Sequence, residues 1–354
     1  MVFLHFSGFR TLSFFFFLSL ILQSDALPRR GRKRPNNNTG AATGAAAGTT
    51  AGLAATGDGT VSQATDGSTI LDKTVNINGL TIRYKISAPA SLFTAASGVP
   101  GGAATAATAA TANNATASQN GLNVLLHGDG GQSFIDFPNQ AVQGGLMGVV
   151  VLAPNRNRFW GGGSGLDRTD GVAHSAAVNT LIQKQLPQDV AFDPANVFFT
   201  GVSGGSLMLS GFFMPAFGAA YKTGVMLNCG ALAPQVAVVD EATLAASTRI
   251  HFQSTQNELA SLQPAIPQAV EAYETLAANA GLSAGQIGAL QTVDGSPAGG
   301  HCEFDGQGFV SGVQLMADSF AHVMLAGGSG QVGGIGNVLT TVVGNENIKF
   351  GTPS

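Results

Sequence analysis

The segment from Asn196 to Ser206, NVFFTGVSGGS, constrains the fold more than any other part of the chain. An apolar run rich in β-branched and aromatic residues leads into Gly201-Val202-Ser203-Gly204-Gly205, and a helix-compatible stretch follows. Glycines on both sides of a serine permit a sharp turn between a strand and a helix, where a side chain would clash. The pattern predicts that Ser203 is an exposed nucleophile at a sheet edge. The alternative is a serine in an ordinary glycine turn, because the chain holds 49 glycines.

Short apolar runs alternate with longer helical patterns over most of the chain. Several of the apolar runs are continuous, which is typical of strands covered on both faces. The alternation predicts an α/β fold with a mostly parallel central sheet flanked by helices on both faces, and ligands bind such sheets at the carboxyl ends of the strands. We expect strands at residues 80–86, 122–126, 148–153, 196–200, 224–227, 249–253 and 287–293, and helices at 173–186, 206–217, 264–280 and 307–325.

The first 26 residues have the pattern of a secretory signal peptide. Arg10 precedes the apolar run SFFFFLSLIL, and small residues at Ser24 and Ala26 fit a cleavage site. The run is too short to span a bilayer, and we find no other apolar stretch of spanning length. We therefore expect an exported, extracellular protein. A basic cluster at residues 29–34 follows, which is either a propeptide cleaved after Lys33-Arg34 or a solvated basic tail.

Two segments of low complexity interrupt the chain. Residues 27–67 combine the basic cluster with an Ala/Thr/Gly-rich tract, which predicts a disordered stalk suited to association with a cell wall. Residues 94–119 have a similar composition and are expected to form a surface loop within a catalytic domain at 68–354. Sequons at Asn37 and Asn114 predict N-glycosylation.

Composition and motifs argue against several function classes. Residues 1–34 hold six of the sixteen basic and one of the twenty acidic residues, so the remainder carries a net charge of −9. An acidic chain without a basic patch is a poor ligand for nucleic acid or for anionic membranes. The glycine pattern at 328–333 follows a helix rather than a strand, which argues against nucleotide binding. No metal-ligand spacing is present, so neither a metal nor a cofactor is expected, and oligomeric state is not predictable.

Two further motifs follow expected strands and complete a hydrolytic site with Ser203. His127-Gly128-Asp129-Gly130-Gly131 predicts a bend whose backbone amides, from Asp129 or a neighbour together with Gly204, bind an oxyanion. His301 follows the last expected strand and is the expected base, because an imidazole with an ordinary pKa of about 6.5 accepts the proton of a serine hydroxyl near neutrality. We expect a structural role for His127, and packing roles for the helix and strand histidines His174, His251 and His322.

The acid that orients the histidine is ambiguous in the sequence. The segment after 249–253 reads Ser254-Thr255-Gln256-Asn257-Glu258, so the acid position falls on Asn257 or on Glu258. We expect Glu258, since an amide in this place favours the wrong histidine tautomer. Asp294, seven residues before His301, is the reserve candidate. A solvent-facing carboxylate is the alternative for both acids.

The two cysteines, Cys229 and Cys302, are expected to form one disulfide, because the secretory route is oxidising. Such a bridge would tie the loop of His301 to the sheet, although two unpaired thiols are the alternative. Four apolar residues near Ser203 are candidates for a substrate pocket, although core packing is the more common role at such positions: Trp160, Phe212, Phe213 and Met214.

The order nucleophile, acid, histidine resembles that of the α/β-hydrolases. HGDGG, Ala153-Pro154-Asn155, Phe159-Trp160 and NVFFTGVSGG resemble the secreted esterases related to polyhydroxybutyrate depolymerases and to feruloyl or acetylxylan esterases, over about residues 80–325. The resemblance implies hydrolysis of carboxylic esters through an acyl-enzyme without a cofactor. The chain departs from it at Asn257-Glu258, where an aspartate is typical. It departs again at Val202, where tannase-like esterases have a cysteine.

The leading hypothesis is therefore a secreted serine esterase acting on a small-molecule or polymer-linked ester. The alternative is a secreted or cell-wall-associated binding protein that has kept a hydrolase fold and lost catalysis. Its main support is the amide at Asn257. A peptidase of the same fold is a third hypothesis.

Overall fold

A computed structural model of the protein describes residues 54–55, 59–64, 66–104, 120–137, 143–336 and 339–351. All of these residues fall in one compact unit, Thr49–Ser354. The expected signal peptide at 1–26 and the sequons at Asn37 and Asn114 lie outside the described residues, so they stay predictions.

The core of the protein is a sheet whose central strands are parallel, as the sequence predicts. The strand order is β1-β3-β4-β6-β5-β7-β8-β9-β10-β11, with β2 paired to β3. The five pairings from β6 through β5, β7, β8 and β9 to β10 are parallel, and the remaining pairings are antiparallel. The strands are β1 (Ala54–Ala55), β2 (Thr60–Gln63), β3 (Thr69–Ile77), β4 (Leu80–Ala88), β5 (Gly121–Leu126), β6 (Leu146–Leu152), β7 (Val197–Val202), β8 (Gly224–Asn228), β9 (Arg249–Gln253), β10 (Gln291–Asp294) and β11 (Thr340–Thr341).

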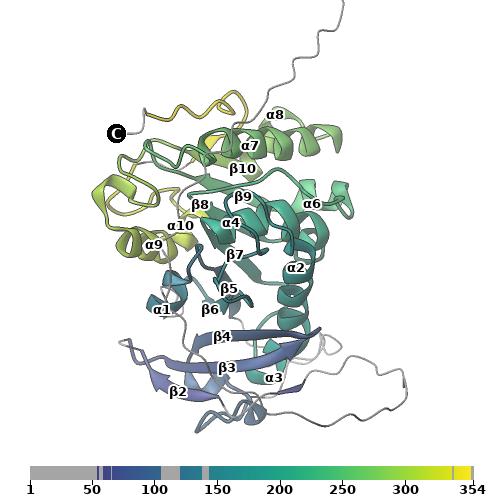
Figure 1. Cartoon of the computed structure of the whole chain (residues 1–354), viewed down its shortest axis with the longest axis vertical. Coiled ribbons are helices and arrows are strands. Elements are labelled where there is room, and N and C mark those ends of the chain that lie inside the picture. The colour runs from purple at the N-terminus through teal and green to yellow at the C-terminus, as the bar shows by residue number, and fades with distance from the viewer. Residues whose placement is uncertain are drawn as a thin grey trace, which may run out of the picture. The chain divides into compact units, whose positions relative to one another are not determined.

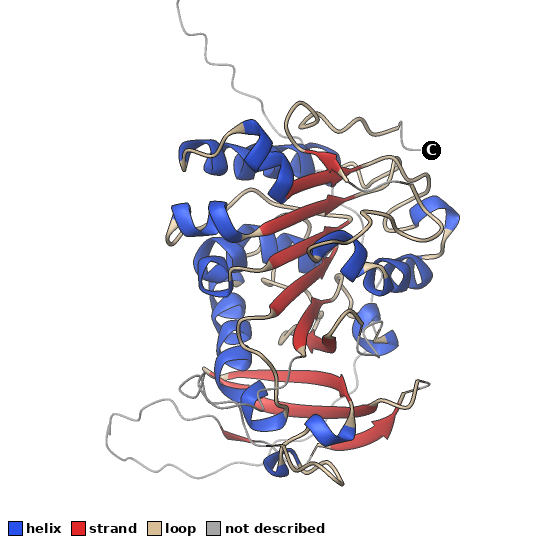
Figure 2. Ribbon diagram, turned by 180° about the vertical axis from the view of Figure 1, so that it is seen from behind, coloured by secondary structure: helices blue, strands red, loops and turns tan. Residues whose placement is uncertain are grey.

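Helices cover both faces of the sheet, so the central strands are buried on both sides (Figures 1 and 2). Val124 and Leu125, neighbours in β5, point into two different apolar cores. The core containing Leu125 is closed by α1, α9 and α10, and the one containing Val124 by helices that include α2, α4 and α7. No helix within the described ranges is long and apolar enough to cross a membrane. The helices are α1 (Gln132–Asp136), α2 (Gly171–Thr180), α3 (Leu186–Asp189), α4 (Gly204–Met208), α5 (Ala219–Tyr221), α6 (Glu241–Ser247), α7 (Leu262–Asn279), α8 (Ala284–Leu290), α9 (Phe309–Asp318) and α10 (Phe320–Met324).

Four expected elements differ from the observed ones. Residues 284–290 form helix α8 rather than the start of a strand, because Ser283 and Gln286 make a capping box that begins a helix there. The helix expected at 307–325 is divided at Ser319 into α9 and α10. The helices expected at 173–186 and 206–217 contain wider π-helical turns, at Leu181–Gln185 and at Leu209–Gly218, where Pro215 cannot donate a helical hydrogen bond.

The ordered sheet also extends beyond the expected boundary at residue 68. Strands β1 and β2 lie within the segment 27–67, and both pair with β3, whose polar residues hid it from the sequence analysis. The start of the loop expected at 94–119 is packed rather than extruded. Ser97 and Val99 are buried, and the N–H of Thr94 donates to the carbonyl of Asp189 at 2.9 Å. Residues 105–119 lie outside the described ranges.

Candidate active site

Ser203 occupies a sharp turn between β7 and α4, at the carboxyl edge of the sheet. Its backbone angles, φ 48° and ψ −113°, are unusual for a residue with a side chain. The turn depends on its glycines, because a Cβ at Gly205 would lie 1.9 Å from the carbonyl oxygen of Leu126, and one at Gly201 would lie 2.6 Å from the Cα of Ser206. The glycines therefore permit the turn because they have no side chain, as the sequence analysis expects.

The serine backbone is also tied to the neighbouring strand. The N–H of Ser203 donates to the carbonyl of Asn228, the last residue of β8, at 2.8 Å. The hydroxyl of Ser206 donates to the same carbonyl at 2.8 Å. A Cβ at Gly230 would lie 3.0 Å from the carbonyl oxygen of Ser203, so the chain after β8 passes close to the turn. These contacts hold the strained turn in place.

The imidazole of His301 bridges Ser203 and Glu258. Its Nε2 lies 2.9 Å from the Oγ of Ser203, and its Nδ1 makes a short hydrogen bond to Oε1 of Glu258. The His301 side chain is 20% exposed, whereas that of Glu258 is fully buried. The three groups form one hydrogen-bonded chain that ends at the only hydroxyl of the three. Such a chain permits proton transfer from Ser203 to His301.

Glu258 is the expected acid that contacts the histidine, and the two other candidates do not. Oε1 of Glu258 also accepts a hydrogen bond from the N–H of Leu259 at 2.8 Å, while Oε2 has no partner within the described part of the chain. The side chain of Asn257 is exposed. The carboxylate of Asp294 accepts hydrogen bonds from the N–H and the hydroxyl of Ser296 at 2.8 and 2.7 Å. Asp294 is therefore a turn-forming residue in this structure.

Four hydrogen bonds join the loop that carries Glu258 to the loop that carries His301, one of them from the side-chain amide of Gln256 to the carbonyl of Ser296 at 2.8 Å. The N–H of Gln256 donates to Pro297 at 2.9 Å and the N–H of Asn257 donates to Gly299 at 3.1 Å, both to carbonyl oxygens. The Thr255 hydroxyl donates to the carbonyl of Gly300, the residue before the histidine, at 2.8 Å. The position of the imidazole therefore depends on contacts between segments that are at least 40 residues apart.

The predicted disulfide between Cys229 and Cys302 is confirmed. The two Cα atoms lie 5.3 Å apart, and the bridge joins the end of β8 to the residue after His301. The N–H of Cys229 donates to the carbonyl of Gln253, at the end of β9, at 2.7 Å. The sulfur atoms lie close to the His301 ring, but because they are bonded to each other this cluster offers only one free metal-binding atom, an imidazole nitrogen.

His127 has a structural role, as expected. Its Nδ1 lies 2.6 Å from the carbonyl oxygen of Gly128 and donates to it, so Nε2 accepts from the N–H of Ala153 at 2.9 Å. Burial lowers the pKa of His127 to about 4, because the charged ring would lose its hydration. The ring is neutral near pH 7 and fixes the loop that begins at Gly128. His174 and His251 are likewise buried and hydrogen-bonded, while His322 is exposed on α10.

The glycine loop after β5 lies beside the serine. A Cβ at Gly128 would be 3.4 Å from the Cβ of Ser203. The N–H groups of Gly130 and Gly131 donate to backbone carbonyls, whereas among the described residues the N–H of Asp129 has no acceptor. Gly204 begins α4, so its N–H has no acceptor within the helix. Asp129 and Gly204 thus keep the donors that the sequence analysis assigned to an oxyanion.

Two residues near Ser203 were missed by the sequence analysis. The ring of Phe309, at the start of α9, approaches Gly128 and is partly exposed. Arg168 makes a two-pronged ion pair with Asp129. Phe309 lies in an ordinary amphipathic helix and Arg168 in a glycine-rich loop, so neither carries a local signal. The four pocket candidates have the more common core role: Trp160, Phe212, Phe213 and Met214 are all buried.

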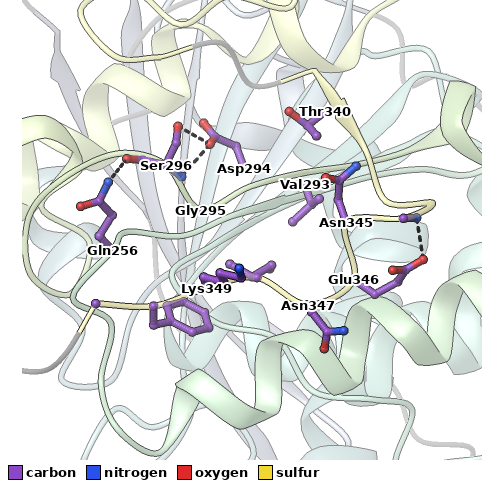
Figure 3. Close-up of a pocket in the computed structure, with 14 residues that line it drawn as sticks. Gln256, Val293, Asp294, Gly295, Ser296, Thr340, Asn345, Glu346, Asn347 and Lys349 are labelled. Carbon is purple, nitrogen blue, oxygen red and sulfur yellow. Dashed lines mark hydrogen bonds between the residues drawn. The ribbon is translucent and has the colours of Figure 1, made fainter.

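A cavity of about 640 Å³ opens at the carboxyl end of β10, next to the acid loop. Figure 3 shows Asp294 and Ser296 on one side of it and Asn345 and Glu346 on the other. Gln256 belongs to its lining, but Ser203, Glu258 and His301 do not. The cavity is therefore separate from the candidate active site.

The positions of the three residues match their strands. Ser203 follows β7, Glu258 follows β9 and His301 follows β10, in a sheet ordered β3-β4-β6-β5-β7-β8-β9-β10 with β4 antiparallel to its neighbours. This is an α/β-hydrolase fold. The α/β-hydrolase sheet places the nucleophile on a strand-to-helix turn, followed along the chain by the acid and the histidine.

Comparisons with known proteins find esterases among the solved structures, all at low sequence identity. No family profile matches the sequence, and no curated protein matches it. A solved structure of fungal esterases from Rhizomucor miehei is 14% identical, with a TM-score of 0.42 over 72% of this chain and 80% of the other. An acetyl xylan esterase from Aspergillus awamori is 14% identical, with a TM-score of 0.38 over 55% and 74%. A cold-adapted esterase from an Arctic intertidal metagenomic library is 13% identical, with a TM-score of 0.38 over 75% and 98%.

Proposed function

We propose that this protein is a serine esterase that hydrolyses carboxylic esters through an acyl-enzyme. The observation that carries the proposal is the hydrogen-bonded chain from the Oγ of Ser203 through His301 to the buried carboxylate of Glu258. A serine hydroxyl is a weak nucleophile until a base removes its proton, and this arrangement supplies a base with a fixed orientation.

In the proposed mechanism, the Oγ of Ser203 attacks the acyl carbon of the ester while Nε2 of His301 takes the hydroxyl proton. Glu258 accepts the hydrogen bond of Nδ1–H, which selects the productive tautomer and stabilises the imidazolium. The free N–H groups of Asp129 and Gly204 bind the negative oxygen of the tetrahedral intermediate. Its collapse releases the alcohol, which takes the proton from His301.

Deacylation repeats these steps with water as the nucleophile. His301 takes a proton from the water, the hydroxide oxygen bonds to the acyl carbon, and the carboxylic acid leaves as Ser203 recovers its proton. This sequence of acyl transfers uses only side chains and backbone amides of the chain and requires no cofactor. The alternative of a degenerate binding protein rested on the amide at Asn257, and the contact between Glu258 and His301 removes that support.

The proposal also places the enzyme outside the cell. The signal-like segment at 1–26, the sequons at Asn37 and Asn114, and the pair of cysteines support export, and the Ala/Thr/Gly-rich tract supports attachment to a cell wall. The acidic composition favours an uncharged or cationic substrate over nucleic acid or an anionic membrane. A small or polymer-linked ester is the proposed substrate class.

A fluorophosphonate probe and a panel of aryl esters test the proposal on the purified, exported protein. We expect the probe to label wild-type protein at Ser203 and Ser203→Ala to abolish both labelling and ester turnover. Ser261→Ala is the matched control, because this hydroxyl is exposed and makes no capping bond at the start of α7. Absence of labelling in folded wild-type protein, or persistent turnover by Ser203→Ala, would refute the proposal.

A further inference from the structure

The loop that carries Asp129 is held by a buried arginine from a distant part of the chain. Both terminal nitrogens of Arg168 donate to the carboxylate of Asp129, at 2.8 Å each. The same nitrogens also donate to the carbonyls of Trp160 at 3.0 Å and Gly165 at 2.6 Å. The Arg168 side chain is 2% exposed and that of Asp129 is 25% exposed. A rigid, bidentate pair of this kind fixes orientation as well as distance.

The carboxylate of Asp129 also contacts the other amide of the proposed oxyanion site. A Cβ at Gly204 would lie 2.1 Å from Oδ1 of Asp129 and 2.7 Å from its Cγ. The side chain of Asp129 therefore packs directly on Gly204, while its own backbone N–H is the second free donor. One residue thus sets the spacing between the two donors, and Arg168 sets the position of that residue.

This arrangement places a negative side chain beside a site where negative charge develops. An uncompensated carboxylate there would oppose the formation of the tetrahedral intermediate, because like charges repel strongly in a partly desolvated site. The guanidinium of Arg168 neutralises the carboxylate at both oxygens. Its Nε has no partner within the described residues, so the side chain is oriented chiefly through its two terminal nitrogens.

We propose that Arg168 and Asp129 are positioning residues that preorganise the oxyanion site, with Arg168 cancelling the charge of the Asp129 carboxylate. This proposal rests on the proposed esterase function. It predicts an unusual order of effects on kcat: removing the arginine alone lowers kcat more than removing both charges does. A purely structural ion pair predicts such a recovery in the free energy of unfolding, but none in the kcat of the folded protein.

A double-mutant cycle with Arg168→Met, Asp129→Asn and the double variant tests this inference. Asp129→Asn keeps the backbone N–H and nearly the same side-chain shape. We expect Arg168→Met to lower kcat on an aryl acetate by about 10²-fold, close to the loss of one oxyanion donor, with KM changed by less than about threefold. We expect the double variant to regain about tenfold in kcat over Arg168→Met, because the unpaired carboxylate is gone.

The control is Arg83→Met, which removes a similar two-pronged pair between Arg83 of β4 and Asp72 of the neighbouring β3, where the arginine side chain is 50% exposed. Its kcat should equal that of wild type. Thermal unfolding of every variant distinguishes a loss of structure from a loss of catalysis.

Arg168→Lys replaces Arg168→Met if the latter does not fold. Lysine keeps the positive charge but lacks the two-pronged geometry of the guanidinium, so kcat should fall by about tenfold. Asp129→Asn should give no recovery of kcat in the Arg168→Lys background.

The inference is overturned if Arg168→Met keeps the kcat of wild type, or if the double variant is as slow as Arg168→Met or slower. A full recovery of Arg168→Lys by Asp129→Asn would also overturn it. Failure of the esterase proposal looks different, because the wild-type protein itself would then neither react with the fluorophosphonate nor turn over the aryl acetate.

Discussion

The turn that carries Ser203 and the loop that carries His301 reach the same site by different physical means. The serine turn is fixed chiefly by sterics, since Gly201 and Gly205 leave no room for side chains against Ser206 and against Leu126 of β5. The histidine loop is fixed by cross-links, namely the disulfide at Cys302 and four hydrogen bonds from the loop that follows β9.

The serine turn and the histidine loop are therefore held in position in two different ways, the first by steric exclusion and the second by cross-links to other segments. The steric turn tolerates almost no change at its glycines. The cross-linked loop has one equally tight position, Gly299, where φ is 116° and a Cβ would lie 1.9 Å from the carbonyl oxygen of Glu303, but its next residue, Gly300, has room for a methyl group. The placement of this loop depends on its partners. The mutations below test whether the two halves of the candidate site respond in these two ways.

The largest effect is expected at Glu258, the partner that orients His301. Glu258→Gln should lower kcat by about 10⁴-fold with little change in KM, because an amide favours the wrong imidazole tautomer and cannot stabilise the imidazolium. Steady-state kinetics on an aryl ester measures the loss. Asp294→Asn and Asn257→Ala are the matched controls, and kcat of both should stay within about threefold of wild type, as for residues remote from the reacting atoms. An inactive Asp294→Asn beside an active Glu258→Gln would assign the acid to Asp294.

The next effect contrasts a glycine in each region. Gly205→Ala places a Cβ 1.9 Å from a backbone oxygen, which cannot move without breaking β5, so we expect a loss of about 3 kcal/mol or more in the free energy of unfolding. Gly300→Ala in the histidine loop meets only the flexible end of Glu303, at 2.9 Å. Its cost should stay below about 1 kcal/mol. Urea unfolding compares the two, and equal costs would contradict the contrast between steric and cross-linked regions.

The same division explains what the sequence predicts. The parallel sheet and the serine turn follow from local patterns, namely apolar runs and glycines whose positions along the chain are sufficient. Strand β9 is observed with the expected bounds, Arg249–Gln253. The two-residue β1, the polar β2 and the alternating β3 were missed, because their pairing compensates for a weak apolar pattern.

The less predictable part of the site depends on contacts between remote segments. Which of Asn257, Glu258 and Asp294 contacts His301 depends on the path of the loop after β9, which is hydrogen-bonded to residues 297–300. No local sequence pattern predicts that path. Arg168 lies 39 residues from Asp129 and belongs to no motif. A sequence motif therefore locates Ser203, while the residues that orient its partners emerge only from the folded chain.

A smaller effect is expected from the disulfide. The Cys229→Ser/Cys302→Ser double variant should lose about 2–4 kcal/mol in the free energy of unfolding, since the bridge restrains a long loop of the unfolded chain. Because the hydrogen bonds to the carbonyls of Gly299 and Gly300 remain, kcat should fall by only about tenfold to a hundredfold, which is the scale of a small misplacement of a reacting group. Complete loss of activity in a folded double variant would show that the hydrogen bonds alone do not position His301.

The smallest effect concerns the pH dependence of stability that the buried imidazoles produce. Burial lowers the pKa of both His127, beneath the glycine loop, and His251, in β9, to about 4. The unfolded chain binds a proton at each below its ordinary pKa of about 6.5, so their contribution is complete above pH 6.5 and is lost as the pH falls toward 4. Lowering the pH from 7 to 5 should reduce the free energy of unfolding by about 1–2 kcal/mol for each of these two histidines.

Urea unfolding at several pH values measures this slope. His251→Gln should remove part of it, because a glutamine side chain does not titrate. The slope that remains in His251→Gln includes the contribution of His127, whose neutral ring holds Gly128 and Ala153, and that of His174, whose pKa burial also lowers. An unchanged slope in His251→Gln would mean that this imidazole is protonated in the folded protein, against its contacts with Thr292 and Gln253.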